Sequence, residues 1–241
     1  MPVAWTRVRG YYRNKGAPKQ GDSKMKAARG LALALGLLAG HSAGAQDLPP
    51  NAQLLVAARQ GDVAAVARLL GAGAAVNSRN RLGDTPLLIS LKNGYKDVAQ
   101  LALDKGADVN LANLSKVTPL MAASFSGNAD LVQLLLGKGA DRSPEDRVGK
   151  TAMVYAAGLG HTEVVQLLIA RGESPRAAYH NDLTALMWAA AYGHTATVKL
   201  LLERGANVNA RDNRGKTALA MAVEGKHKEV EQLLRKAGAA E

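Results

Sequence analysis

The chain has 241 residues, 47% of them hydrophobic, so it can bury a core as one ordinary domain or as a short array of repeats. Its formal net charge of +11 is uneven: residues 1–45 hold eight Lys and Arg against one acid, and residues 46–241 hold 23 bases against 19 acids. A balance of +4 is ordinary for a solvated surface and argues against a nucleic-acid partner. The absence of cysteine excludes disulfides and cysteine nucleophiles, and it suits an oxidising compartment.

The first part of the chain has the layout of a secretory signal peptide. Three basic residues, Lys24, Lys26 and Arg29, stand before a short apolar run at 31–39. That run is shorter than the roughly 20 residues that span a bilayer, so no membrane span is expected after cleavage. No cysteine is available for a lipid anchor.

Small residues mark the expected cleavage site. Ala43 and Ala45 are spaced as A-x-A, and we expect the cut between Ala45 and Gln46. Because Met25 opens a complete signal peptide at 25–45, residues 1–24 are expected to be a disordered or untranslated extension. The apolar and alanine-rich signal favours a bacterial protein that is periplasmic or secreted.

From residue 48 onward the sequence repeats with a period of 33 residues. Threonine recurs at Thr85, Thr118, Thr151, Thr184 and Thr217, and glycine recurs at Gly73, Gly106, Gly139, Gly172, Gly205 and Gly238. Two residue types in phase with one period predict stacked units. The expected units are approximately 48–81, 82–114, 115–147, 148–180, 181–213 and 214–241, and the first lacks the threonine.

Each unit predicts two helices and a projecting loop. The threonine caps a short helix, proline follows it in two units at the first helical position, and a glycine such as Gly94 permits the turn to the second helix. The second helix carries Val and Leu in its core-facing positions and ends at the periodic glycine, which can adopt a left-handed conformation. A polar, turn-rich segment such as 209–216 then predicts a hairpin-like loop.

A 33-residue unit with threonine, often proline, and leucine, then a Val/Leu-rich helix and Gly-Ala-Asn-Val-Asn, resembles the ankyrin repeat. The resemblance covers about 48–240 and implies an all-α solenoid domain at 46–241, with about six 33-residue helix-turn-helix units and projecting β-hairpin-like loops. The family histidine is replaced at Leu88 and its equivalents, and Lys116 and Asp182 stand where the family has a turn glycine. Irregular geometry is therefore expected in the loops at 143–147 and 174–182.

No residue pattern predicts an enzyme. His161, His194 and His227 share one position in successive units, but stacked helices lie about 8–10 Å apart, which is too far for the three to share a metal ion. We therefore expect a structural role for them, no metal and no cofactor. A loop pair of His180 and Asp182 without a placed nucleophile is weak support for a hydrolase, in which His180 or His194 would act.

The resemblance implies that a protein partner binds in the groove formed by the loops and first helices. Aromatic residues are concentrated there, since Tyr155 and Trp188 share a position in adjacent units and Tyr192 follows one turn later. They either fill gaps between helices or form a binding hot spot. The candidate binding residues are Tyr155, Trp188, Tyr192, Arg147, Lys150, Asp182, Leu183, Arg214 and Lys216. The basic loop residues favour a partner with an acidic surface.

The expected function is a non-catalytic protein-binding module that acts after export, as a monomer. Two alternatives stay open. The chain is an accessory protein that stabilises or activates an exported enzyme, or it is an exported effector that acts on host proteins.

Overall fold

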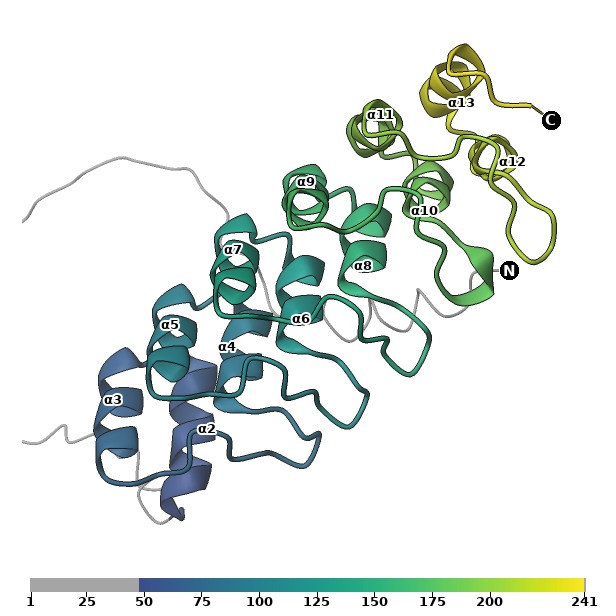
Figure 1. Ribbon diagram of the computed structural model, residues 1–241. Coiled ribbons are helices and arrows are strands. Elements are labelled where there is room, and N and C mark those ends of the chain that lie inside the picture. Colours follow the sequence, from purple (N-terminus) through teal and green to yellow (C-terminus); the bar gives the residue numbers. More distant parts are fainter. Residues whose placement is uncertain (1–47, 241) are drawn as a thin grey trace, which may run out of the picture. The chain divides into compact units, whose positions relative to one another are not determined.

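The computed structural model describes residues 48–240, so the expected extension at 1–24, the signal peptide and the cleavage site at Ala43, Ala45 and Gln46 lie outside the described residues. The described part holds twelve α-helices, joined two by two (Figure 1). They are α2 Pro50–Gln60, α3 Val63–Gly71, α4 Pro86–Asn93, α5 Lys96–Asp104, α6 Pro119–Ser126, α7 Ala129–Gly137, α8 Ala152–Leu159, α9 Thr162–Ala170, α10 Ala185–Ala191, α11 Thr195–Glu203, α12 Ala218–Glu224 and α13 Lys228–Lys236.

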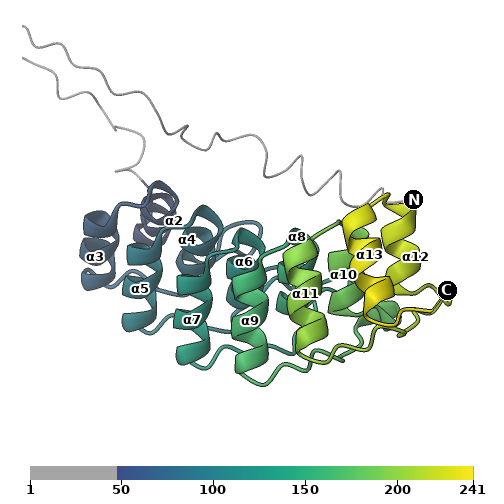
Figure 2. The ribbon, with the colours of Figure 1, turned by 90° about the horizontal axis from the view of Figure 1, so that it is seen from above.

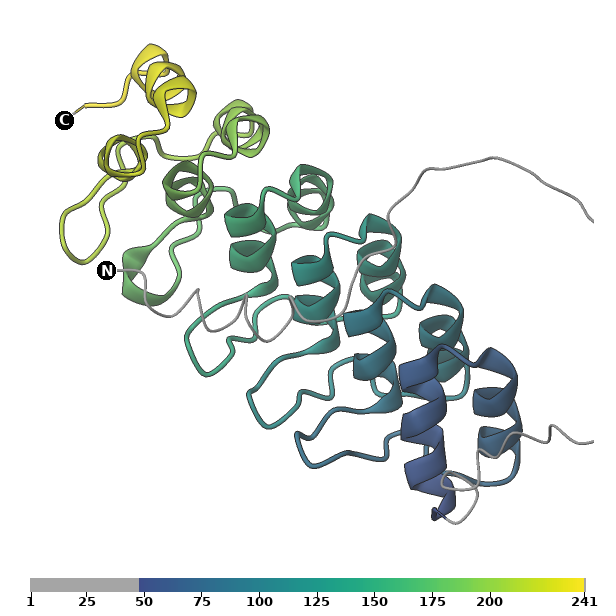
Figure 3. The same cartoon turned by 180° about the vertical axis from the view of Figure 1, so that it is seen from behind.

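The helices form two rows. The inner row, from which the loops project, consists of α2, α4, α6, α8, α10 and α12, and the outer row consists of the other six helices (Figures 1 and 3). Figure 2 shows the outer helices side by side in chain order. The four middle inner helices are buried on nearly every side, because each packs between two inner neighbours and against the outer row; for example, Pro86–Leu91 of α4 are all buried. The expected solenoid is confirmed.

The predicted threonine caps begin five of the six inner helices. Each hydroxyl accepts a hydrogen bond from the backbone N–H three residues later, as from Leu88 to Thr85 at 3.1 Å, and this pairs an N–H that the first turn leaves without a partner. In two repeats, methionine stands in place of the family histidine and partly takes over its hydrogen bonding. The Sδ atoms of Met121 and Met187 accept a hydrogen bond from the backbone N–H of the capping threonine, at 3.5 Å.

The predicted glycines also hold their expected conformations. Gly94, Gly127 and Gly160 cap inner helices with φ of 71–75°, and the periodic glycines that follow the outer helices have φ of 83–95°. Lys116 and Asp182, which replace the loop glycine, have φ of 58°, so the backbone keeps the left-handed turn although the side chain disfavours it.

The histidines join neighbouring repeats, as the structural interpretation predicts. In His161, His194 and His227, Nε2 lies 3.1 Å from a backbone carbonyl oxygen of the previous inner helix, at Phe125, Gly158 and Ala191. Each ring also rests on the capping glycine of that helix: a Cβ atom on Gly160 would lie 2.5 Å from His194 Nδ1. Within residues 48–240, no group of three or more His, Cys, Asp or Glu could hold a metal ion.

An Asn or Asp organises four of the five hairpin-like loops. Asn80, Asn113, Asp146 and Asp212 each accept two backbone N–H bonds through Oδ1, for example from Val148 and Lys150 to Asp146 at 2.9 Å. The expected irregularity at 143–147 is limited to the start of the loop, where Ser143 bonds within its own turn to Asp141; from Asp146 onward the loop makes the same turn bonds as its equivalents.

The loop at 174–182 is irregular, as expected. Tyr179 stands at the position of the organising Asn or Asp, and a short 3₁₀ helix, His180–Asp182, follows it with Asn181 at φ 61°. The Tyr179 hydroxyl donates to Glu173 Oε1 at 2.9 Å instead. Burial, reinforced by the Glu173 charge, raises the pKa of Tyr179, so the hydroxyl stays protonated and can donate.

Candidate functional site

Aromatic side chains gather on the inner helices α6, α8 and α10. Phe125 and Tyr155 meet edge to face with ring centroids 5.7 Å apart, and Trp188 and Tyr192 stack with centroids 6.2 Å apart and planes 9° from parallel. Tyr192 stacks in turn on His194, at 6.4 Å. We call Trp188, Tyr192 and the nearby Lys150 the aromatic surface; all three side chains are half-buried.

Lys150 connects the two aromatic groups. Its Nζ atom lies 5.5 Å from the ring centroid of Tyr155 and 5.0 Å from that of Trp188, within the range of cation–π attraction. Burial lowers the pKa of the Lys150 ammonium, and the charge of Asp146 opposes part of that shift. A partner carboxylate that reached this ammonium would meet a cation whose water shell is already reduced.

Tyr155 differs from the other aromatic candidates because it is buried, with only 9% of its surface exposed. Its hydroxyl donates to Asp146 Oδ2 at 2.5 Å, and thereby ties helix α8 to the loop before it. The gap-filling hypothesis therefore describes Tyr155, whereas Trp188 packs against the core and remains half-exposed.

The charged loop candidates have different surroundings. Arg147 is exposed at a loop tip. Arg214 folds back on the buried carboxylate of Asp212, which it contacts at 2.7 Å, while its own side chain stays 60% exposed. Lys216 pairs with Glu224 at 2.5 Å. Lys150 stands at the repeat position of Lys216, but glycine, Gly158, occupies the position of Glu224.

Asp182 and Leu183 lie in the irregular loop. Asp182 is exposed, and its backbone N–H donates to the carbonyl of Tyr179 at 2.9 Å within the turn. Leu183 is half-buried and packs against the core. The structure thus brings Lys150, Trp188 and Tyr192 together, and it places Asp182 and Leu183 in a turn whose geometry they help to define.

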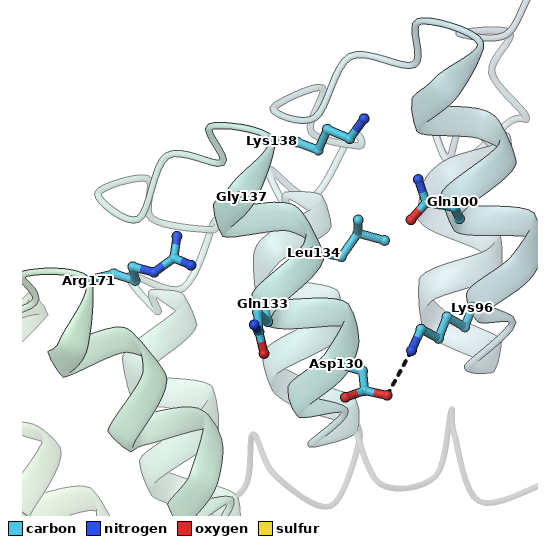
Figure 4. A pocket seen from close by; sticks show the side chains of 8 residues that line it. All are labelled: Lys96, Gln100, Asp130, Gln133, Leu134, Gly137, Lys138 and Arg171. Atoms are coloured by element: carbon cyan, nitrogen blue, oxygen red, sulfur yellow. Dashed lines mark hydrogen bonds and ion pairs between the residues drawn. The ribbon is translucent and has the colours of Figure 1, made fainter.

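A hollow on the other side of the helices has different chemistry. It lies on the outer row, and Figure 4 shows the side chains that line it, which are Lys96, Gln100, Asp130, Gln133, Leu134, Gly137, Lys138 and Arg171. The exposed pair of Lys96 and Asp130, 2.9 Å apart, bridges α5 and α7 across it. None of the sequence candidates lines this hollow.

Comparisons with known proteins identify the fold family. A family model described as ankyrin repeats (3 copies) matches residues 54–146, 112–179 and 153–240. The chain belongs to the ankyrin-repeat family. The crystal structure of the human ASB11 ankyrin repeat domain is similar, with a TM-score of 0.73 and 31% sequence identity over 78% of this chain and 84% of that chain. No curated protein matched in the sequence comparison.

Ankyrin repeats are protein–protein interaction modules and are typically non-catalytic. No helix among residues 48–240 is both long and apolar enough to cross a membrane. The hydrolase alternative has little support from His194, because its Nε2 contacts the Gly158 carbonyl and its ring packs against Gly160. His180 packs against Gly149 in the preceding loop.

One group of exposed surface residues was not predicted from the sequence. Leu82 and Val148, at loop tips, are exposed over 51% and 61% of their surface. A sequence signal was present, because apolar residues interrupt loops that are otherwise polar.

Proposed function

We propose that this ankyrin-repeat protein acts after export as a binding module, and that the aromatic surface of Lys150, Trp188 and Tyr192 contacts the partner. The cation–π geometry of Lys150 and Trp188 carries the proposal, because it places a partly desolvated charge beside a half-exposed indole. Trp and Tyr, together with Arg, dominate the energetics of many interfaces. Export rests on the signal-peptide pattern of the sequence.

The partner is a protein with an acidic region near an apolar or aromatic side chain. Lys150 supplies positive charge beside Trp188, which supplies a broad apolar surface, whereas the charge of Lys216 is paired with Glu224. A preformed surface loses little conformational entropy on binding, so a modest contact area suffices. The exported partner enzyme and the host protein of the two alternatives both fit this description.

Quantitative capture tests the proposal. Wild-type protein immobilised on beads is incubated with periplasmic extract and, separately, with host-cell extract, and the partner that it enriches is titrated against each variant. Trp188→Ala should weaken binding by about 2 kcal/mol or more, roughly 30-fold. Tyr192→Ala and Lys150→Gln should weaken it less.

Controls separate binding from folding. Lys199→Gln removes an exposed cation from the outer helix α11 and should leave binding unchanged. Because Trp188 packs against the core, each variant is used only at a temperature where circular dichroism shows it fully folded. Equal affinity of wild type and all three aromatic-surface variants would reject this surface. N-terminal sequencing of exported protein tests the cut after Ala45.

A further inference from the structure

Three consecutive loop tips expose large apolar side chains. Leu82, Leu114 and Val148 are 51%, 57% and 61% exposed, which makes them the most exposed large hydrophobic residues in the described part of the chain. Scattered apolar residues are normal on a surface, but a set repeated at successive loop tips forms a pattern that folding does not require.

Backbone hydrogen bonds fix these tips relative to one another. The Leu114 N–H donates to the Leu82 carbonyl at 3.0 Å, and the Arg147 N–H donates to the Ser115 carbonyl at 3.2 Å. Leu114 also lies against the preceding loop, because a Cβ atom on Gly83 would be 3.0 Å from Leu114 Cγ. The apolar side chains are therefore held in place before any partner arrives.

The charge around the tips is mainly positive. Arg81, Lys116 and Arg147 are exposed beside the apolar side chains, and Glu145 is the exposed carboxylate among these tips. The other two carboxylates of these loops are buried and engaged within the protein. Asp84 accepts from Lys92 at 2.7 Å, and Asp146 accepts from Tyr155.

We propose that the loop-tip surface, formed by Arg81, Leu82, Leu114, Lys116, Arg147 and Val148, docks an acidic segment of a partner protein that carries aliphatic side chains. The apolar side chains gain from burial against the partner's aliphatic groups, and the three cations select carboxylates over ammonium groups. This surface goes beyond the proposed function, because it does not include Trp188 and can fail separately.

Fluorescence anisotropy with synthetic peptides provides the test. The probe is a short labelled peptide in which leucines alternate with glutamate and glycine. One matched peptide replaces glutamate by lysine, and a second replaces leucine by serine. Wild-type protein should bind the first peptide and neither of the others, and binding should weaken as salt rises.

Substitutions locate the binding site. The triple variant Leu82→Ser, Leu114→Ser and Val148→Ser should bind the acidic peptide at least about tenfold more weakly. The matched control, Val63→Ser with Val223→Ser, removes two other exposed valines, 38% and 46% exposed, and should bind like wild type.

A charge series completes the design. Arg81→Gln with Lys116→Gln and Arg147→Gln should lose most of the salt dependence, whereas Lys199→Gln with Arg204→Gln and Lys226→Gln should keep it. These control positions are exposed and lie outside the loop-tip surface. Circular dichroism confirms that every variant is folded at the assay temperature.

Several results would overturn the proposal. They are no binding of the acidic peptide to wild type, equal binding of the lysine peptide, and unchanged binding by the triple serine variant. A wild-type dimer that the triple variant abolishes in sedimentation velocity would show instead that a second copy covers these tips. Trp188→Ala should bind the peptide like wild type. Weaker peptide binding by this variant would show that the peptide occupies the aromatic surface and would contradict a separate loop-tip site.

Discussion

The hydroxyl of Tyr155 donates to Asp146 Oδ2 at 2.5 Å, and both side chains are less than a tenth exposed. The other carboxylate oxygen of Asp146 accepts the backbone N–H groups of Val148 and Lys150. One buried carboxylate thus holds the loop and the following helix together. Without Tyr155, Asp146 Oδ2 would lose a strong donor in a place that water reaches poorly.

Tyr155→Phe should lower the free energy of unfolding by about 1–3 kcal/mol, the range for leaving a buried polar group without its partner. Asp146→Asn should cost less, because Asn80 and Asn113 make the same loop bonds through Oδ1. Urea denaturation of both single variants and the double variant measures the coupling between the two side chains. A cost for Tyr155→Phe that is the same with and without Asp146→Asn would contradict the pairing.

Two loop glycines at the same repeat position differ in their surroundings. Gly83 and Gly215 have φ of 78° and 77°, but a Cβ atom on Gly83 would lie 2.8 Å from the backbone nitrogen of Leu114, whereas Gly215 has nothing within 4 Å. Gly215→Ala should cost about 1–2 kcal/mol for the left-handed backbone alone. Gly83→Ala should cost measurably more in thermal or urea unfolding. Equal losses of unfolding free energy in the two variants would mean that Leu114 can move aside without an energetic penalty.

The histidine contacts make stability depend on pH. Burial lowers the pKa of His161 below its ordinary value near 6.5, the Phe125 carbonyl opposes this shift, and the neighbouring His194 adds to it. The unfolded chain therefore binds a proton at a higher pH than the folded chain does. Stability from this group is complete above about pH 6.5 and is lost as the pH falls through the folded pKa.

His161→Asn should reduce the loss of unfolding free energy between pH 7 and pH 5, measured by urea denaturation at each pH. Asparagine is a matched replacement, because Asn128 occupies this position one repeat earlier and caps its helix through the Leu131 N–H at 3.1 Å. If His161→Asn left the pH dependence of stability unchanged, the buried imidazole would not be its source.

Ser143 stands where three other repeats have an asparagine that accepts a backbone N–H from the following repeat. Asn77 accepts from the N–H of Asp108 at 3.0 Å, and Asn110 accepts from the N–H of Asp141 at 2.8 Å. Ser143 instead bonds within its own turn, to Asp141. Ser143→Asn should restore a bond to the N–H of Ser174 and raise stability by about 0.5–1.5 kcal/mol.

Hydrogen exchange at the Ser174 amide checks this bond directly, because the amide should exchange more slowly in Ser143→Asn. Ser115→Asn, at an exposed loop position, is the matched control and should change neither the exchange nor the unfolding free energy. Faster or equal exchange at Ser174 would show that asparagine does not reach across this junction.

The period of 33 residues was enough to predict the helices, the threonine caps and the left-handed glycines, because these follow from local chemistry. It also placed Tyr155 and Trp188 at one repeat position, but it could not tell that the first is buried and the second half-exposed. How far a side chain is buried depends on its neighbours in space, which here are Asp146 for Tyr155 and Lys150 for Trp188.

The two loops expected to be irregular show the same difference between what local sequence predicts and what contacts in space decide. Proline at Pro144 suggested a distorted loop, yet Asp146 two residues later imposes the regular turn. At Tyr179 no carboxylate or amide is available to do so, and the 3₁₀ helix appears. Contacts between loop tips join residues 32 positions apart, which no local pattern in the sequence encodes.

The loop at 174–182 has a consequence for how the array unfolds. Within the described loops, no backbone bond joins the tip at Val148 to His180, whereas the N–H groups of Leu114, Arg147 and Asn213 each donate to the preceding loop tip. Because each repeat contacts only its neighbours, cooperativity is limited by the weakest interface. The junction between α2–α9 and α10–α13 lacks this one bond, so the loop tip adds less to the coupling between the two blocks than its equivalents do. A ligand that contacts both Lys150 and Trp188 would span this junction and strengthen the coupling between the two blocks.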